Sequence, residues 1–378
     1  METRVSVEIG NQTIVAAYGS VSDTGVVKVV DSAMTLTDGY CYGEITDKGS
    51  LMHAIQDAVM QATKGASIQG GVIQFVMPRE SVRTTECTVC LKGVKRVNKD
   101  TIRDAAVQCK KEFNVVDGEE IIDMIPAKLI VNGEESEKLF VERASEIQLT
   151  WNVYTVSTKI ADLWMEIFDV FKSDSIAFIP YERACGEAFR ALSDCKELAI
   201  VDLGAESERL LYFKGGMLKL SSSIRIGADS IDSDIAQAYK LASSDARMLK
   251  LSHGEALLYA CKEDYVPLPD GINECKTKDL MVVIQCRLEE LYEGVIFQLQ
   301  QIGCNGGDVA LVGGGNNLKN SDLLFKILSG MRIVPVKYLC QAKSETPLMV
   351  KEFAAAIGAL VSDPQDDKPV KRGWFSWL

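Results

Sequence analysis

Two stretches of this chain, far apart in the sequence, share one alternation of apolar and polar residues. The first reads V-S-V-E-I-G-N-Q-T-I-V-A-A-Y from Val5, and the second reads A-I-V-D-L-G-A-E-S-E-R-L-L-Y from Ala199. Each predicts an apolar strand, a tight turn after an acidic residue and a glycine, and a second apolar strand. Laid over one another, they match Glu8 with Asp202, Ile9 with Leu203, Gly10 with Gly204, Thr13 with Ser207 and Tyr18 with Tyr212. This repeat predicts a duplicated α/β domain with a cleft between the two copies.

Other patterned segments predict the elements around the two hairpins. A further strand follows each hairpin, at 26–30 and 217–220. Residues 79–154 form an insert with signals of its own, namely strands at 87–91, 121–125 and 139–141, a helix at 99–113 and a tight turn at Asn132-Gly133. Helical spacing elsewhere predicts helices at 51–63, 158–171, 186–192 and 285–299, and residues 233–299 are mostly helical.

A glycine turn near the end of the chain is a third feature with candidate chemistry. Residues 308–320 read D-V-A-L-V-G-G-G-N-N-L-K-N, which predicts a buried strand, a triple-glycine turn and then a helix at 321–328. Such a turn lets a flat ligand lie against bare backbone. It lacks the G-x-G-x-x-G spacing of a dinucleotide-binding fingerprint.

Composition narrows the class of protein. The chain has 378 residues, 47% hydrophobic and 25% charged, which predicts a globular protein of two domains or more. Its net charge of −12 argues against general nucleic-acid binding, which needs basic surface to neutralise phosphates. The first residues lack a signal-peptide pattern, and no apolar run is long enough to span a bilayer. We therefore expect a cytoplasmic protein.

The cysteines indicate a reducing compartment. Their count of 11 is odd and they are scattered, which favours free thiols. Cys87 and Cys90 form a lone C-x-x-C on a predicted strand, where positions three apart face opposite ways. Together with only two histidines in the chain, this disfavours a zinc site.

The segment from Gly227 to Leu257, G-A-D-S-I-D-S-D-I-A-Q-A-Y-K-L-A-S-S-D-A-R-M-L-K-L-S-H-G-E-A-L, resembles the bacterial cell-division protein family FtsA. That family typically reads G-x-x-x-T-x-D-I-A followed by K-x-x-x-G-x-A. The V-E-I-G near the start, the insert and I-Q-C-R-L-E-E-L from Ile284 fit the same family in order. The hairpins and the glycine turn also resemble the wider nucleotide-binding fold of actin, sugar kinases and heat-shock chaperones.

The resemblance implies an α/β, actin-like fold made of duplicated RNase H-like subdomains, with an inserted FtsA-type subdomain and a short C-terminal amphipathic tail. The implied domains are 1–78 plus 155–196 and 197–232 plus 300–361 for the two RNase H-like subdomains, 79–154 for the insert, 233–299 for the cap of the second half, and 362–378 for linker and tail. ATP with Mg²⁺ would bind in the cleft. The protein would polymerise like actin, bind the C-terminal tail of FtsZ and hold it to the membrane.

The first hairpin is the expected site for part of the nucleotide's phosphates and for the metal. Gly10 opens its turn, and Asn11, Gln12 and Thr13 offer donors to phosphate oxygens. Glu8 stands where the wider fold has an aspartate that holds Mg²⁺ through water, because hard cations prefer oxygen ligands. A core hairpin with a polar turn is the alternative interpretation.

The second hairpin departs from the family pattern D-(I/L)-G-G-G-T. Asp202, Gly204 and Ser207 keep the pattern, so Asp202 is the second expected metal ligand and the other two are expected phosphate contacts. Glu206 replaces a glycine and would repel a phosphate about 4 Å away by roughly 4 kcal/mol at an effective dielectric of 20. Glu206 would then point to solvent, pair with Arg209 or share a metal with the phosphate. Whether ATP is bound or hydrolysed stays open.

The remaining expected contacts follow from the family. Lys250 would lie near the ribose, with Arg247 in place of the family's usual glutamate, and Gly227 is a further expected nucleotide contact. A solvated helix face is the alternative interpretation for the two cations. Arg287 would receive the acidic FtsZ tail, because a guanidinium suits carboxylates. The adenine would lie against Gly313, Gly314, Gly315 and Asn316.

The chain ends in an aromatic segment, K-R-G-W-F-S-W-L, after a polar linker. As a helix it places Trp374, Trp377 and Leu378 on one face with Phe375 at the edge, while Lys371 and Arg372 flank that face. This suits an anionic bilayer surface, and a polymer carrying many such tails would bind by multivalency. The alternative is that the aromatic side chains dock on the protein's own body.

These features together predict a scaffold at the inner face of the cell membrane, at the division septum, with at most slow ATP hydrolysis. Two rival functions remain from the sequence. One is a pilus-assembly adaptor of the same fold, and the other is a small-molecule kinase, which would need a catalytic base and a substrate site in the cleft.

Overall fold

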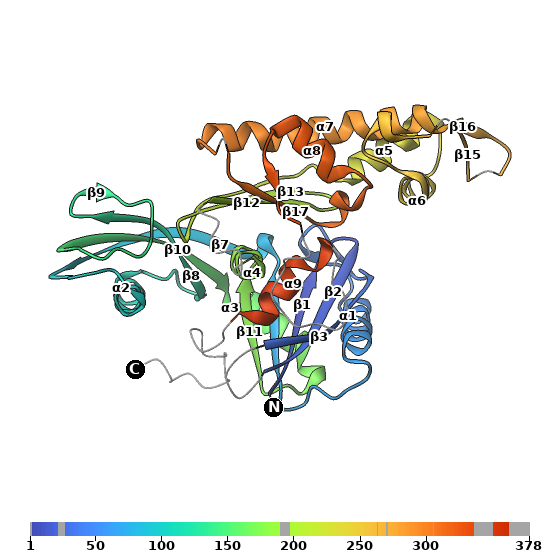
Figure 1. Ribbon diagram of the computed structural model, residues 1–378. Coiled ribbons are helices and arrows are strands. Elements are labelled where there is room, and N and C mark those ends of the chain that lie inside the picture. Colours follow the sequence, from blue (N-terminus) through green and yellow to red (C-terminus); the bar gives the residue numbers. More distant parts are fainter. Residues whose placement is uncertain are drawn as a thin grey trace.

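Two five-stranded sheets carry the repeat found in the sequence (Figure 1). The computed structural model describes residues 2–21, 27–189, 197–262, 264–269, 271–304, 306–335 and 351–362. The first sheet has the order β11-β6-β1-β2-β3 and the second β14-β13-β12-β17-β18. In each, three strands run antiparallel in sequence order, a fourth pairs in parallel with the first of them, and a fifth pairs in parallel with the fourth. The duplicated α/β fold expected from the repeat is confirmed.

The strands of the two sheets correspond one to one. Those of the first are β1 (Glu2–Ile9), β2 (Thr13–Val21), β3 (Val27–Leu36), β6 (Val72–Met77) and β11 (Ser175–Pro180). Those of the second are β12 (Glu197–Leu203), β13 (Glu208–Lys214), β14 (Met217–Ile224), β17 (Asp308–Val312) and β18 (Arg332–Ile333). The interior strands have almost continuous buried apolar residues, because helices cover both faces of each sheet.

Helices cover the outer face of each sheet. On the first sheet these are α1 (Lys48–Thr63) and α3 (Thr158–Phe168), packed around an aromatic cluster that includes Phe75 and Trp164. The second sheet is covered by α5 (Asp229–Tyr239), α6 (Ser243–His253), α7 (Thr277–Gln301) and α8 (Ser321–Ser329). The helix predicted at 285–299 is longer than expected, because it begins at Thr277 and ends at Gln301. None of the described helices is both long and apolar enough to cross a membrane.

Two further helices, α4 (Tyr181–Ala188) and α9 (Ala354–Val361), lie between the sheets (Figure 1). Their apolar residues share one core with side chains of both sheets, so this core joins the two repeats. The helix predicted at 186–192 begins earlier, at Tyr181, and residues 190–192 lie outside the described part of the chain. Residues 363–378, which include the predicted membrane-binding residues, also lie outside it.

The crossing of α4 and α9 depends on a glycine. A Cβ added to Gly358 would lie 1.7 Å from the carbonyl oxygen of Ala184. We expect Gly358→Ala to lower the free energy of unfolding by about 3 kcal/mol, because the backbones of the two helices must move apart. Urea denaturation measures this.

Gly294 provides the matched control, because a Cβ there meets no atom within 4 Å. Gly294→Ala in helix α7 should raise stability by about 0.5–1 kcal/mol through the better helix propensity of alanine. Equal effects of the two substitutions would contradict the close crossing.

The insert is a separate four-stranded sheet at one end of the molecule (Figure 1). Its order is β7-β10-β8-β9, and helix α2 (Lys99–Glu112) covers one face. The strands are β7 (Val82–Lys92), β10 (Glu146–Ser157), β8 (Glu119–Val131) and β9 (Glu134–Glu135). The turn at Asn132-Gly133 is present, with φ of 51° and 90°. The strand predicted at 139–141 is wrong, because Val141 makes only an isolated bridge to Val97.

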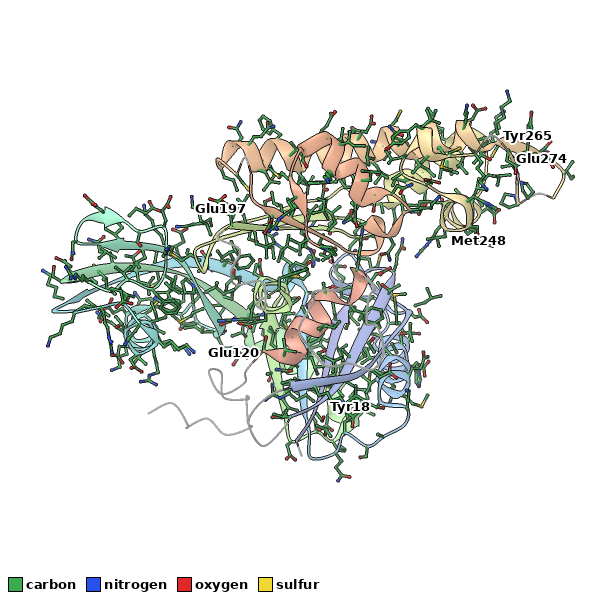
Figure 2. All side chains as sticks on the ribbon, in the orientation of Figure 1. Tyr18, Glu120, Glu197, Met248, Tyr265 and Glu274 are labelled. Carbon is green, nitrogen blue, oxygen red and sulfur yellow. The ribbon has the colours of Figure 1, made fainter. Side chains whose placement is uncertain are left out.

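Short elements complete the described chain. They are β4 (Tyr40–Cys41), β5 (Glu44–Ile45), β15 (Tyr265–Pro267), β16 (Glu274–Lys276), and the 3-10 turns Arg79–Ser81, Asp169–Phe171, Leu258–Ala260, Gly314–Asn317 and Lys351–Phe353. Figure 2 shows Tyr265 and Glu274 on the hairpin of β15 and β16, at the end of the molecule opposite the insert.

Candidate functional site

The turn of each repeat hairpin has the same backbone geometry. The N–H of Gly10 donates to the carbonyl of Thr13 at 2.9 Å, and the N–H of Gly204 donates to the carbonyl of Ser207 at 2.9 Å. These are the positions that the sequence repeat lays over one another. A side chain at either glycine would crowd the accepting carbonyl, at 3.0 Å and 3.1 Å respectively. The two turns are therefore structural equivalents, each held tight by its glycine.

Side chains join the two turns directly, in what we call the hairpin junction: residues 10–13, residues 204–207 and Asp229. Asn11 Nδ2 donates to Glu206 Oε2. Gln12 Nε2 donates to Asp229 Oδ1 at 2.5 Å. In both bonds an amide of the first repeat meets a carboxylate of the second. The expected phosphate donors Asn11 and Gln12 are thus already bonded to carboxylates of the protein.

Glu206 neither points freely to solvent nor pairs with Arg209, two of the arrangements expected from the sequence. It is half-buried, and besides Asn11 it hydrogen-bonds with Tyr42. Desolvation, and then the nearby charge of Asp229, raise the pKa of the Glu206 carboxyl. The Glu206 carboxylate therefore lies between the two turns and is held there by the first repeat.

Asp229 reaches the junction because helix α5 begins against the second turn. The N–H of Ala228 donates to the carbonyl of Gly204 at 2.9 Å, and that of Asp229 to the carbonyl of Ala205 at 2.8 Å. A Cβ on Gly227 would lie 2.4 Å from the same carbonyl oxygen of Ala205. Gly227 is thus required for the close approach of helix and turn.

Arg209 lies with the two carboxylates that were expected to hold a metal. Its guanidinium stacks on the ring of Tyr181, 4.5 Å from the centroid, and its Nη1 is 3.9 Å from Asp202 Oδ2. The Tyr181 hydroxyl donates to the same carboxylate oxygen at 2.6 Å. Burial and the charge of Asp202 raise the pKa of Glu8 to about 8, and the charge of Arg209 opposes that rise. A resident cation therefore balances these two acids.

The residues present do not fit a divalent metal. Magnesium prefers several carboxylate and water oxygens, but Glu8 and Asp202 already interact with the charge of Arg209. Among the described residues there is no group of three or more Asp, Glu, His or Cys side chains that could hold a metal ion. This arrangement differs from the expected Mg²⁺ site.

Lys250, expected near a ribose, is buried and paired. Its Nζ lies 2.6 Å from Asp232 Oδ1 and donates to the carbonyl of Ala228 at 3.2 Å. Arg247 is half-buried, and its charge lowers the pKa of both Asp229 and Asp232, while desolvation raises them more. Lys250 and Arg247 therefore place positive charge beside the acidic side chains of α5, Asp229 and Asp232.

The glycine turn after β17 packs against β12. Gly313 has a φ of 83°, and a Cβ there would lie 2.1 Å from Asp202 Oδ1; a Cβ on Gly315 would lie 2.5 Å from Leu203 Cγ. Gly314 is less restricted, because its nearest neighbour would be Glu352 at 3.4 Å. The close packing of β12 thus accounts for two of the three glycines without a ligand.

The side chain of Asn316, a residue expected beside the adenine, has its partners in the core. Its side chain is fully buried, accepts from the Tyr292 hydroxyl at 2.7 Å and donates to the carbonyls of Val312 at 2.5 Å and Val201 at 3.3 Å. These three bonds fix the turn to the core. The amide of Asn316 is therefore structural.

Arg287 also has partners within the protein. It makes a two-pronged contact with Asp234 of α5, at 2.6 Å and 3.0 Å, and its Nη1 donates to Glu290 at 2.5 Å. This clamp joins α7 to α5 and draws on the planar geometry of the guanidinium. An acidic peptide would have to displace one of these carboxylates.

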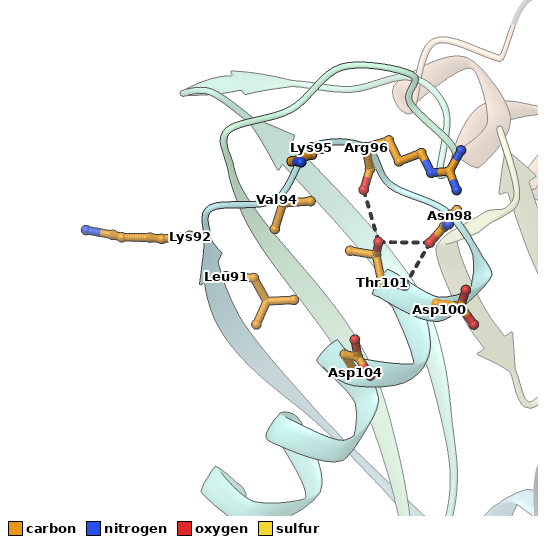
Figure 3. Close-up of a pocket in the computed structure, with 9 residues that line it drawn as sticks. All are labelled: Leu91, Lys92, Val94, Lys95, Arg96, Asn98, Asp100, Thr101 and Asp104. Atoms are coloured by element: carbon orange, nitrogen blue, oxygen red, sulfur yellow. Dashed lines mark hydrogen bonds between the residues drawn. The ribbon is translucent and has the colours of Figure 1, made fainter.

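A hollow of about 420 Å³ lies elsewhere, on the insert, where the loop after β7 enters α2 (Figure 3). Thr101 bonds there to Asn98, which caps the helix, and to the carbonyl of Arg96. Exposed cations and carboxylates both line it: Lys92, Lys95, Arg96, Asp100 and Asp104. This mixed charge indicates no particular ligand.

For three residues in and around the junction, the sequence predicted no role. Tyr42 and Tyr181 hold the carboxylates Glu206 and Asp202, and Asp229 bonds to Gln12. Asp229 lies in the quoted family segment, so its place at the start of a helix after Gly227 was a usable signal. No pattern in the sequence around Tyr42 or Tyr181 distinguishes either tyrosine from others in the chain.

A family profile and the curated proteins both match the cell-division protein FtsA. A profile described as "Cell division protein FtsA" matches residues 199–358. FtsA of Staphylococcus epidermidis is 24% identical over 376 residues, covering 95% of this chain and 78% of that protein. FtsA of Escherichia coli K12 is 24% identical over 312 residues, covering 79% of this chain and 73% of that protein.

Solved structures of similar fold belong to the actin-like ATPases. A PilM-PilN type IV pilus biogenesis complex matches with a TM-score of 0.64 at 14% identity, covering 97% of this chain and 99% of that chain. MreB5 of Spiroplasma citri bound to AMPPNP matches with a TM-score of 0.55 at 10% identity, covering 97% of each chain. At these identities the likeness shows the fold alone. By the profile and the curated relatives the chain is similar to the cell-division protein FtsA, and it has an actin-like fold.

Proposed function

We propose that this chain is a cell-division scaffold of the FtsA type, which polymerises, binds the tail of FtsZ and tethers FtsZ filaments to the cytoplasmic membrane at the septum. The observation that carries the proposal is the 24% identity to an FtsA over 95% of the chain. The four-stranded insert and the aromatic C-terminus are consistent with it. The domain boundaries expected from the sequence are part of this proposal.

ATP is the candidate ligand of the hairpin junction in this proposal, because Asn11 and Glu206 join the two glycine turns and Gly313 lies against Asp202 beside them. Mg²⁺ is expected from the family, but the residues around Glu8 and Asp202 do not fit it. Ligand binding would require Glu206 to leave Asn11. Any hydrolysis is therefore expected to be slow, and the main role is that of a scaffold.

The C-terminal segment supplies the membrane contact in this proposal. Removal of residues 363–378 should reduce binding to vesicles of anionic phosphatidylglycerol by about tenfold or more, because two tryptophans and a phenylalanine no longer enter the interface. Vesicle pelleting of the full and truncated chains measures this.

A matched control replaces Trp374 and Trp377 by alanine in the full chain, which keeps Lys371 and Arg372. This variant should bind almost as weakly as the truncated chain, and neutral phosphatidylcholine should bind all forms less well. Unchanged pelleting after truncation would contradict the tether and favour docking of the aromatics on the protein's own body.

A pilus-assembly adaptor is the second candidate, favoured by the PilM-PilN match over almost the whole chain. The FtsA relatives have higher identity at similar coverage, so we place that candidate second. Pull-down with a peptide of the FtsZ C-terminal tail separates the two, since a pilus adaptor should not retain it. Loss of retention in Arg287→Ala would assign that contact to Arg287. A kinase of the same fold would instead turn over a sugar or acid substrate with ATP.

A further inference from the structure

Two amide–carboxylate bonds connect the repeats at the hairpin junction. Asn11 donates to Glu206, and Gln12 donates to Asp229 at 2.5 Å. The partners are separated by 195 and 217 positions in the chain. Each bond therefore joins the two repeats directly, in addition to the core around α4 and α9 and the Tyr181–Asp202 bond that also connect them.

In both bonds the first turn donates a hydrogen bond to a carboxylate, as it would to a bound anion. A carboxylate oxygen accepts from Asn11 in the way that a phosphate oxygen would, and both are negatively charged. The backbone N–H of Tyr42 donates to Asn11 Oδ1 at 3.1 Å, which fixes the amide with its Nδ2 toward Glu206. The first turn thus holds an anion that belongs to the protein.

A cation belongs to the same arrangement. Arg209 stacks on Tyr181 and faces Asp202, and its charge also acts on Glu8 and on Glu80. An arginine stays protonated at any ordinary pH. Its guanidinium therefore keeps a permanent positive charge beside these carboxylates, whereas a divalent ion would supply that charge only while bound.

We infer that the junction of this chain contains its own substitutes for nucleotide and metal: Glu206 serves as the anion and Arg209 as the cation, so the two repeats stay bridged without either ligand. The inference stands on the contacts of the junction and does not depend on the proposed membrane or FtsZ contacts. A nucleoside triphosphate must displace Glu206 to bind. Its affinity is then lowered by up to about a thousandfold, and a divalent metal adds little to it.

The test measures ATP binding to the full chain by calorimetry, with and without millimolar Mg²⁺, for the native protein and two variants. Glu206→Gly removes the anion, whereas Glu206→Gln keeps the shape and an acceptor for Asn11 without the charge. We expect weak native binding, at least about a hundredfold tighter binding by the glycine variant, and an intermediate value for the glutamine variant. Mg²⁺ should change each affinity by less than about threefold.

Hydrogen exchange without nucleotide tests the bridge itself. The amides of residues 11–13 should exchange faster in Glu206→Gly than in the native chain, while Glu206→Gln stays close to native. Native binding of ATP at micromolar concentration that requires Mg²⁺ would overturn the inference. Equal affinity and equal exchange in all three proteins would overturn it as well. Vesicle pelleting is expected to be the same for all three, so failure of the proposed tether is seen separately.

Discussion

An Arg209→Leu variant should lose about 3–5 kcal/mol of unfolding free energy at about pH 9, and clearly less at about pH 5.5. The substitution removes the guanidinium that lies 3.9 Å from Asp202 and acts on the charge of Glu8. A buried carboxylate left without its cation is costly, which sets the large value at high pH. The stacking of Arg209 on Tyr181 is lost at any pH, and this loss accounts for the smaller destabilisation at about pH 5.5.

The sign of the pH dependence follows from Glu8. Its pKa is raised to about 8 in the folded protein from a usual value of 4.5, so the folded state holds the proton over a range in which the unfolded state has lost it. Native stability therefore falls as the pH rises from about 4.5 through about 8. In the folded protein Glu8 is neutral below about pH 8, including at pH 5.5, and needs no cation there. Above that pH the ionised Glu8 depends on Arg209, so the cost of the substitution grows with pH.

Urea denaturation at the two pH values measures both quantities, and a double-mutant cycle with Glu8→Gln isolates their coupling. Glutamine cannot ionise, so in that background the cost of Arg209→Leu should become nearly independent of pH. A cost that is the same at both pH values in the native background would show that Arg209 does not balance Glu8.

The architecture was predictable from the sequence because it depends on local pattern. Apolar alternation around an acidic residue and a glycine gave both hairpins, and the equivalent bonds of Gly10 and Gly204 confirm the repeat. The helix predicted at 99–113 agrees with α2 to within one residue, since Asn98 caps its start. The wrong strand at 139–141 shows the limit: a short apolar run pairs only where a neighbouring strand is available.

The chemistry of the junction was less accessible, because it depends on partners distant in the chain. Glu206 was recognised as anomalous, but its bond to Asn11 joins residues 195 positions apart. Asn316 lies in the expected glycine turn, yet the turn directs its amide to Tyr292 in the core. Residue type and spacing identify a polar group, whereas its partner is decided by packing of the whole fold.

Lys250→Met should destabilise the protein by about 3–5 kcal/mol, because it leaves a buried aspartate without its cation. Lys250 and Asp232 are both buried and lie 2.6 Å apart, and the same ammonium donates to the carbonyl of Ala228 at the start of α5. Urea denaturation at neutral pH measures the loss. The exposed Lys326 of α8 is the matched control, and Lys326→Met should change stability by less than about 0.5 kcal/mol.

The double variant Lys250→Met/Asp232→Leu decides whether the lysine is structural. Replacing both members of a buried pair by apolar residues is often neutral, so this variant should recover to within about 1 kcal/mol of the native protein. A lysine held free for a ribose would behave differently, with a small loss in the single variant and no recovery in the double one. Recovery would mean that Lys250 serves to join α6 to the start of α5, the helix whose first residue bonds to Gln12 across the junction. The stability of this ion pair and the bridging of the two repeats would then depend on the same short helix start.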